Sequence, residues 1–170
     1  MAKVLQVGES LVGEGNEVAH IDLFIGSKDG PVGQAFAASM INQKEGHSNL
    51  LALVAPNLPC KPDTIMSNKV TIKGAAQVGQ MFGPAQAAVS RAIVDSVRDG
   101  VIPQAEVDDL CVIVGVFIHW DATDDKKIFD YNYTATKEAL ARAMQSQPGV
   151  DSVLSGAGAA HHPFAGGADD

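Results

Sequence analysis

The chain is poor in aromatic residues and in positive charge. Phe, Trp and Tyr make up 5% of its 170 residues, and 12 Lys and Arg stand against 20 Asp and Glu, for a formal net charge of −8. A surface of this sign does not attract nucleic acid or an anionic membrane, because both select basic patches. So few rings also do not provide a base-stacking platform. We therefore expect no nucleic-acid partner and no membrane partner.

Long apolar runs and cysteine motifs are also lacking. No run approaches the ~20 residues that a membrane-spanning helix needs, and the first residues turn polar too early for a signal-peptide core. The two cysteines, Cys60 and Cys111, form no CxxC pair and give no reason to expect an oxidising compartment. His161 and His162 are adjacent but have no acidic or Cys partners nearby, so we expect no metal site. A cytoplasmic protein is expected.

Apolar residues make up 46% of the chain, which is enough for the core of one domain. Strand patterns occupy residues 17–25, 64–72 and 110–118, and a short apolar run occupies residues 50–55. Helical patterns occupy residues 31–44, 74–82, 84–98 and 124–145. This order predicts one sheet with helices packed against it, of the α+β or the α/β class.

Alternation along residues 17–25 places two ionisable side chains together. Side chains two residues apart share a face of a strand, so His20 and Asp22 lie side by side. The opposite face is apolar and is the predicted core side; it consists of Ala19, Ile21, Leu23 and Ile25. By the same rule Lys69, Thr71 and Lys73 share one face of the strand predicted at 64–72.

Two interpretations fit these polar faces. If both strands line one cleft, the cleft holds an imidazole, a carboxylate, an ammonium and a hydroxyl, which suits proton transfer near neutral pH. A solvated sheet face that carries one polar pair accounts for the same spacing. Gln86, in the first turn of the helix at 84–98, either hydrogen-bonds an amide-rich ring or faces water. His119 and Trp120 end the strand at 110–118 and either line a pocket or serve the structure.

Several longer stretches, in the same order along the chain, resemble the formaldehyde-activating enzyme family. They are residues 15–23 (GNEVAHIDL), 55–62 (APNLPCKP), 68–72 (NKVTI), 80–86 (QMFGPAQ) and 114–120 (VGVFIHW). The His-Pro-Phe at 162–164 also fits. The resemblance covers about residues 3–146, which we take as the enzyme domain. Residues 147–170 then form a Gly/Ala-rich C-terminal tail.

The resemblance implies a fold and a reaction. The fold is α+β and similar to the second domain of ribosomal protein S5, and the assembly is a ring-shaped homopentamer with pterin sites between subunits. The family condenses formaldehyde with tetrahydromethanopterin, its co-substrate, to methylene-tetrahydromethanopterin and water. It uses no permanently bound cofactor and no metal.

The resemblance also assigns roles to residues. The acid–base histidine falls on His20, and the pterin-contacting residues fall on Asp22, Leu51, Lys69, Thr71 and Gln86. A second hypothesis remains open: a catalytically weak paralogue that binds a pterin, or that senses or carries formaldehyde. A purely structural ring-forming protein is a third.

Overall fold

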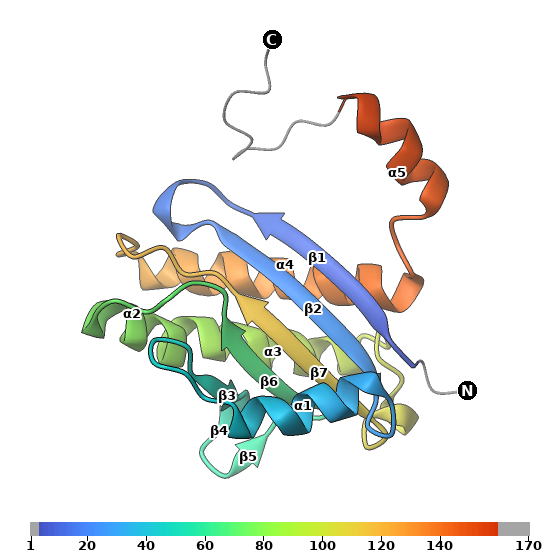
Figure 1. Ribbon diagram of the computed structural model, residues 1–170, viewed down its shortest axis with the longest axis horizontal. Helices are drawn as coiled ribbons and strands as arrows, with labels where there is room; N and C mark the ends of the chain where they lie inside the picture. Colours follow the sequence, from blue (N-terminus) through green and yellow to red (C-terminus); the bar gives the residue numbers. More distant parts are fainter. Residues whose placement is uncertain (1–3, 160–170) are drawn as a thin grey trace.

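Five strands form one mixed sheet in the computed structural model, of which we describe residues 4–159 (Figure 1). The strands, in their order across the sheet, are β1 (Gln6–Val12), β2 (Ala19–Ser27), β7 (Leu110–Val116), β6 (Asp63–Asn68) and β3 (Asn49–Leu51). β6 and β7 run parallel, and the other neighbours run antiparallel. The mixed sheet confirms the α+β class. The comparison with ribosomal protein S5 stays a prediction.

Two long helices cover one face of the sheet. α3 (Gln86–Arg98) and α4 (Asp125–Gln145) lie side by side behind it, with α4 against β1 and β2 (Figure 1). The side chains of Ile21, Leu23 and Ile25 point into this layer and are buried, as the alternation along β2 predicts. α1 (Pro31–Ile41) lies on the opposite face and covers only one end of it (Figure 1).

The other elements are short. A separate hairpin is formed by β4 (Leu53–Ala55) and β5 (Leu58–Pro59), so the apolar run 50–55 divides between two sheets. α2 (Ala75–Gln80) continues through a π-helical turn, η2 (Met81–Ala85), directly into α3. The two helices predicted at 74–82 and 84–98 are therefore continuous, because the wider turn accommodates Pro84, which has no N–H to donate. Short 3-10 turns occur at η1 (Gly15–Glu17), η3 (Gln104–Glu106) and η4 (Ala157–Ala159).

The strand predicted at 64–72 is shorter than expected. β6 ends at Asn68, which pairs with Val116, the last residue of β7. Lys69 still donates its N–H to the Val116 carbonyl (2.8 Å), and beyond it β7 offers no further backbone partner. Residues 69–73 are thus not in a strand, and alternation does not place Lys69, Thr71 and Lys73 on one face.

The tail has a regular element where its composition predicts none. α5 (Val150–Gly156) projects away from the sheet and helices (Figure 1). His161, His162 and the motif at 162–164 lie outside the described residues. Over residues 4–159, no helix combines the length and the apolar character that a bilayer crossing requires.

Candidate active site on the open face of the sheet

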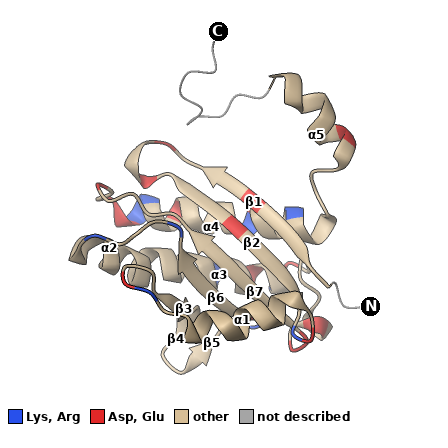
Figure 2. Ribbon diagram, viewed as in Figure 1, with Lys and Arg blue, Asp and Glu red and all other residues tan. Residues whose placement is uncertain are grey.

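The sheet face that α3 and α4 leave uncovered carries the candidate site. His20 and Asp22 point to this face from β2, with 33% and 45% of their side chains exposed. Glu9 on β1 is paired with Asp22 and points the same way. Figure 2 shows the acidic residues at neighbouring positions of β1 and β2. Two adjacent strands thus bring an imidazole and two carboxylates together.

Lys69 completes the group from the far side of β7. Its aliphatic stem crosses Gly115, which is the β7 partner of Asp22: a Cβ at Gly115 would lie 3.3 Å from Lys69 Cγ. The ammonium then reaches Asp22 Oδ2 at 2.5 Å and His20 Nδ1 at 3.0 Å. The missing side chain at Gly115 therefore provides the path by which Lys69 meets residues two strands away.

His20 lies between an ammonium and a carboxylate. Its Nδ1 faces Lys69, and its Nε2 lies 3.0 Å from Glu9 Oε1. Asp22 Oδ1 is 3.6 Å from the same Nε2, which is too long for a hydrogen bond. Glu9, which the sequence did not indicate, is the carboxylate that hydrogen-bonds the ring. Asp22, the predicted neighbour, is engaged by Lys69.

A pocket of about 360 Å³ adjoins His20. Its other walls are mostly apolar and aromatic: Leu11, Val18, Phe117, His119 and Trp120. The rings of His119 and Trp120 are stacked with centroids 4.1 Å apart, and Lys73 Nζ lies 5.1 Å from the centroid of Trp120. Such a pocket suits a flat heterocycle, because flat rings stack on aromatic side chains.

The remaining predicted residues do not join His20 in this chain. Leu51 lies on the same open face, on β3, and two strands separate it from β2. Thr71 packs against the turn at Gly46, where its methyl group occupies the space that a Cβ would need. Gln86 begins α3 on the opposite side of the sheet. The structure thus brings together His20, Asp22 and Lys69, but not Leu51, Thr71 or Gln86.

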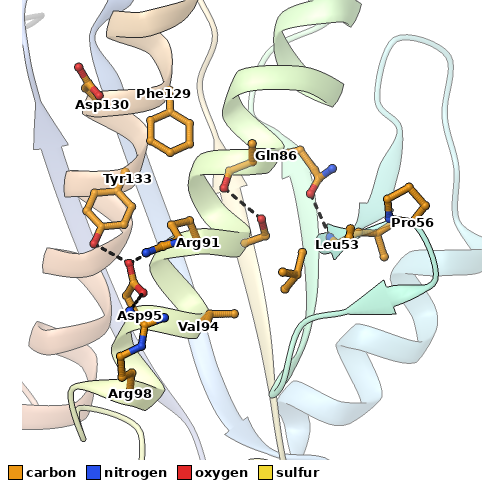
Figure 3. Close-up of a pocket in the computed structure, with 14 residues that line it drawn as sticks. Leu53, Pro56, Gln86, Arg91, Val94, Asp95, Arg98, Phe129, Asp130 and Tyr133 are labelled. Atoms are coloured by element: carbon orange, nitrogen blue, oxygen red, sulfur yellow. Dashed lines mark hydrogen bonds and ion pairs between the residues drawn. The ribbon is translucent and has the colours of Figure 1, made fainter.

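Gln86 lines a second, larger hollow of about 950 Å³ between the β4–β5 hairpin, α3 and α4 (Figure 3). Its Oε1 accepts a hydrogen bond from the Leu53 N–H (3.0 Å). At the other end the Asp95 carboxylate pairs with Arg91 Nε at 2.7 Å and with Arg98 Nη1 at 2.8 Å. It also accepts a hydrogen bond from the Tyr133 hydroxyl at 3.0 Å (Figure 3).

Burial raises the pKa of Asp95, but hydrogen bonds from Arg91 and Tyr133 outweigh it and leave that pKa below its ordinary value. Asp95 is therefore a carboxylate at neutral pH that joins α3 to α4. This hollow has an apolar wall and a polar end, where Arg91 and Arg98 are both paired with Asp95.

The described part of the chain contains no ready set of metal ligands. Between residues 4 and 159, no group of three or more His, Cys, Asp and Glu is arranged to hold an ion.

Comparisons with known proteins agree with one another. The sequence profile of the formaldehyde-activating enzyme family matches residues 7–165. The chain is 53% identical over 159 residues to the 5,6,7,8-tetrahydromethanopterin hydro-lyase of Methanosarcina barkeri, covering 94% of this chain and 89% of that protein. It is 57% identical over 148 residues to the bifunctional enzyme Fae/Hps of Methanocella arvoryzae, covering 87% of this chain and 37% of that protein. The corresponding protein of Archaeoglobus fulgidus is 50% identical over 161 residues, covering 95% of this chain and 41% of that protein. The chain thus spans less than half the length of these bifunctional relatives.

Proposed function

Because this chain belongs to the formaldehyde-activating enzyme family, we propose that it condenses formaldehyde with tetrahydromethanopterin to methylene-tetrahydromethanopterin and water. One observation carries the proposal: the identity to a tetrahydromethanopterin hydro-lyase extends over nearly the full length of both proteins. The proton-transfer group on the open face supports it. Tetrahydromethanopterin is a co-substrate in this scheme, and the reaction needs no permanently bound cofactor.

The reaction needs an acid at one step. An amine of the pterin adds to the carbonyl carbon of formaldehyde, and after proton transfer from nitrogen to oxygen the product is a hydroxymethyl amine. Hydroxide is a poor leaving group, so the oxygen must be protonated as the carbon–oxygen bond breaks and water departs. The second pterin amine then bonds to the same carbon and releases its proton, which restores the acid. A positioned acid of this kind typically contributes about 10²–10⁴-fold to the rate.

We assign that acid to His20. It lines the aromatic pocket, and its ring nitrogens contact Glu9 and Lys69. An imidazole exchanges protons near neutral pH, so one group can both give the proton to the oxygen and take one from the closing amine. In this scheme Asp22 and Lys69, which lie beside His20, contact the polar edge of the pterin. Trp120 stacks on the pterin ring.

The separation of the predicted residues supports a site shared between subunits. Leu51 and Gln86 are too far from His20 for one small ligand to contact all three within a single chain. Leu51 is on β3, which β7 and β6 separate from β2, and Gln86 lies behind the sheet. A neighbouring copy supplies these contacts if the site lies at an interface. Exposed apolar side chains on the open face, including Leu11, Phe24 and Leu51, suit such an interface. We therefore propose the homopentamer that the family resemblance implies, and a cytoplasmic location for it.

The test is pterin-dependent formaldehyde consumption. Purified protein, formaldehyde and tetrahydromethanopterin are mixed, and the methylene product is followed against a blank without protein, because amines and formaldehyde also condense unaided. A rate above the blank that disappears in His20→Ala, while the pterin still binds, supports both the reaction and its acid. A rate equal to the blank contradicts the proposed function and favours a pterin-binding paralogue.

A further inference from the structure

We propose that Glu9 is a positioning residue for the reaction, because it holds the His20 ring so that Nδ1 is the nitrogen that carries the transferred proton. This inference rests on the proposed function. Glu9 lies on the edge strand β1, which has no apolar alternation in its sequence. The basis of the inference is the direction of the hydrogen bonds at the two ring nitrogens.

The donors and acceptors around the ring allow one arrangement of protons. A lysine ammonium has three N–H donors and no acceptor, so His20 Nδ1, 3.0 Å from Lys69 Nζ, accepts a hydrogen bond. In a neutral imidazole the other nitrogen then carries the proton. Nε2–H therefore donates to the Glu9 carboxylate at 3.0 Å. Lys69 thus sets the tautomer, and Glu9 fixes the orientation of the ring.

Asp22 does not provide this contact. Its Oδ1 is 3.6 Å from Nε2, and its Oδ2 is paired with Lys69 at 2.5 Å. Glu9 is in turn held in place through its backbone, because Arg142 Nη1 donates to the Glu9 carbonyl at 2.6 Å. The neighbouring Ser10 hydroxyl donates to Glu138 at 2.6 Å, so β1 is tied to α4 at Glu9 and at the next residue. The Glu9 carboxylate therefore projects from a fixed segment of strand.

The arrangement determines which nitrogen reacts. When His20 takes up a proton, the proton binds Nδ1, since Nε2 already carries one that points to Glu9. Lys69 then turns its N–H groups to Asp22, which it already contacts. Four side chains that carried two negative charges and one positive charge become neutral in sum. Nδ1–H gives its proton to the leaving hydroxymethyl oxygen, the carbon–oxygen bond breaks, and Nδ1 later accepts the proton that the closing amine releases.

The kinetic test compares two substitutions at one position. Glu9→Leu removes the acceptor, and kcat is expected to fall about tenfold or more, while the KM for tetrahydromethanopterin stays within about twofold. Glu9→Gln keeps an oxygen that accepts the Nε2 proton, and it is expected to restore kcat to within about threefold of the wild type. The matched control is Glu14→Gln, an exposed glutamate in the turn after β1, which leaves both constants unchanged. An unchanged kcat in Glu9→Leu, or a change confined to KM, overturns the proposal.

A spectroscopic test does not depend on activity. Nitrogen-15 NMR of the histidine rings, with the His20 signals assigned by their loss in His20→Gln, distinguishes protonated from unprotonated ring nitrogens. In the neutral wild-type ring we expect Nε2 protonated and Nδ1 unprotonated, and we expect the Nε2 signal to move in Glu9→Leu much further than in Glu14→Gln. A protonated Nδ1 in the neutral ring overturns the proposal, and so does an Nε2 signal that does not move in Glu9→Leu.

The two tests separate the two claims. If the wild type shows no rate above the blank, the proposed function fails, and the NMR result alone decides whether Glu9 orients the ring. If the wild type is active and Glu9→Leu is equally active, the function stands and the positioning role is wrong.

Discussion

The ammonium of Lys69 lies 2.5 Å from the carboxylate of Asp22, although β7 separates the strand of Asp22 from the end of β6. An ordinary side chain on β7 would stand between them. Gly115 occupies that position, directly opposite Asp22, and the Lys69 stem passes over it. The candidate site therefore depends on a residue that contributes no functional group.

We expect Gly115→Val to disrupt the site without unfolding the chain. The Cβ would sit 3.3 Å from Lys69 Cγ and 3.5 Å from the Asp22 carbonyl oxygen, and the branched methyl groups would displace the lysine stem. The rate of methylene product formation should fall about tenfold or more. Gly115→Ala should keep most of the rate, because its single methyl group needs only a small movement of the flexible stem. Full activity in Gly115→Val would show that the Lys69 contact with Asp22 is not needed.

Trp120 provides a test of the aromatic pocket. Half of its side chain is exposed, so its removal should leave the free energy of unfolding almost unchanged. Stacking of a heterocycle on an aromatic side chain is worth about 1–3 kcal/mol, so Trp120→Ala should raise the KM for tetrahydromethanopterin about tenfold with little loss of kcat. Trp120→Phe, which keeps a ring, serves as the control. An unchanged KM in Trp120→Ala would place the pterin elsewhere.

The centre of the fold follows from sequence patterns. The alternation of buried Ile21, Leu23 and Ile25 with half-exposed His20 and Asp22 identifies both the strand and its two faces, because a half-buried strand must alternate. The apolar residues 110–116 indicate a central strand because side chains on both of its faces are buried: Leu110, Cys111 and Val112 are all buried where α1 packs on β7. These features are local consequences of burial, and they include the histidine and its neighbour.

The edge strand β1 is not predicted by such patterns. Its two buried positions are Gly8 and Ser10, so no apolar periodicity marks it. The reason is the close approach of α4: a Cβ at Gly8 would collide with the backbone of Ala139. Glu9 was missed with the strand that carries it. The sequence also did not show that Leu51 and Gln86 lie far from His20. Spacing along a chain does not reveal on which face of the sheet a residue lies, or in which copy of the chain it contributes to a site.

Glu17 predicts a pH dependence of stability. Its carboxylate accepts the backbone N–H groups of Thr123 (3.0 Å) and Asp124 (3.2 Å), just before α4 begins. The N–H group of Thr123 and then that of Asp124 lower the pKa of Glu17 from its ordinary value, because they favour the charged form. A carboxyl whose pKa is lower in the folded state stabilises the fold above its unfolded pKa. That stabilisation is lost as the pH falls through the folded pKa.

We therefore expect the wild type to lose more free energy of unfolding than Glu17→Gln between neutral pH and the acid range in which carboxyl groups titrate. Urea unfolding at a series of pH values measures the difference. Glu14→Gln, a nearby exposed glutamate, should follow the wild-type curve. Parallel curves for the wild type and Glu17→Gln would mean that the contact with the start of α4 contributes no charge-dependent stability.

The packing of β1 on α4 makes the last prediction, since it fixes the strand from which Glu9 projects. Gly8→Ala places a methyl group against the Ala139 carbonyl and the Ala143 side chain, and neither can move without shifting α4. Overpacking of this kind costs about 1–3 kcal/mol, so the urea midpoint should fall accordingly. Gly79→Ala in α2, where nothing lies within 4 Å of the new Cβ, is the matched control, and it should stabilise the fold by about 0.5–1 kcal/mol.

Because β1 must move away from α4 in Gly8→Ala, the folded variant should also lose turnover through the displaced Glu9. Gly79→Ala should keep its turnover. Wild-type stability in Gly8→Ala would mean that the strand and the helix are not in close contact, and Glu9 would then lack its rigid support.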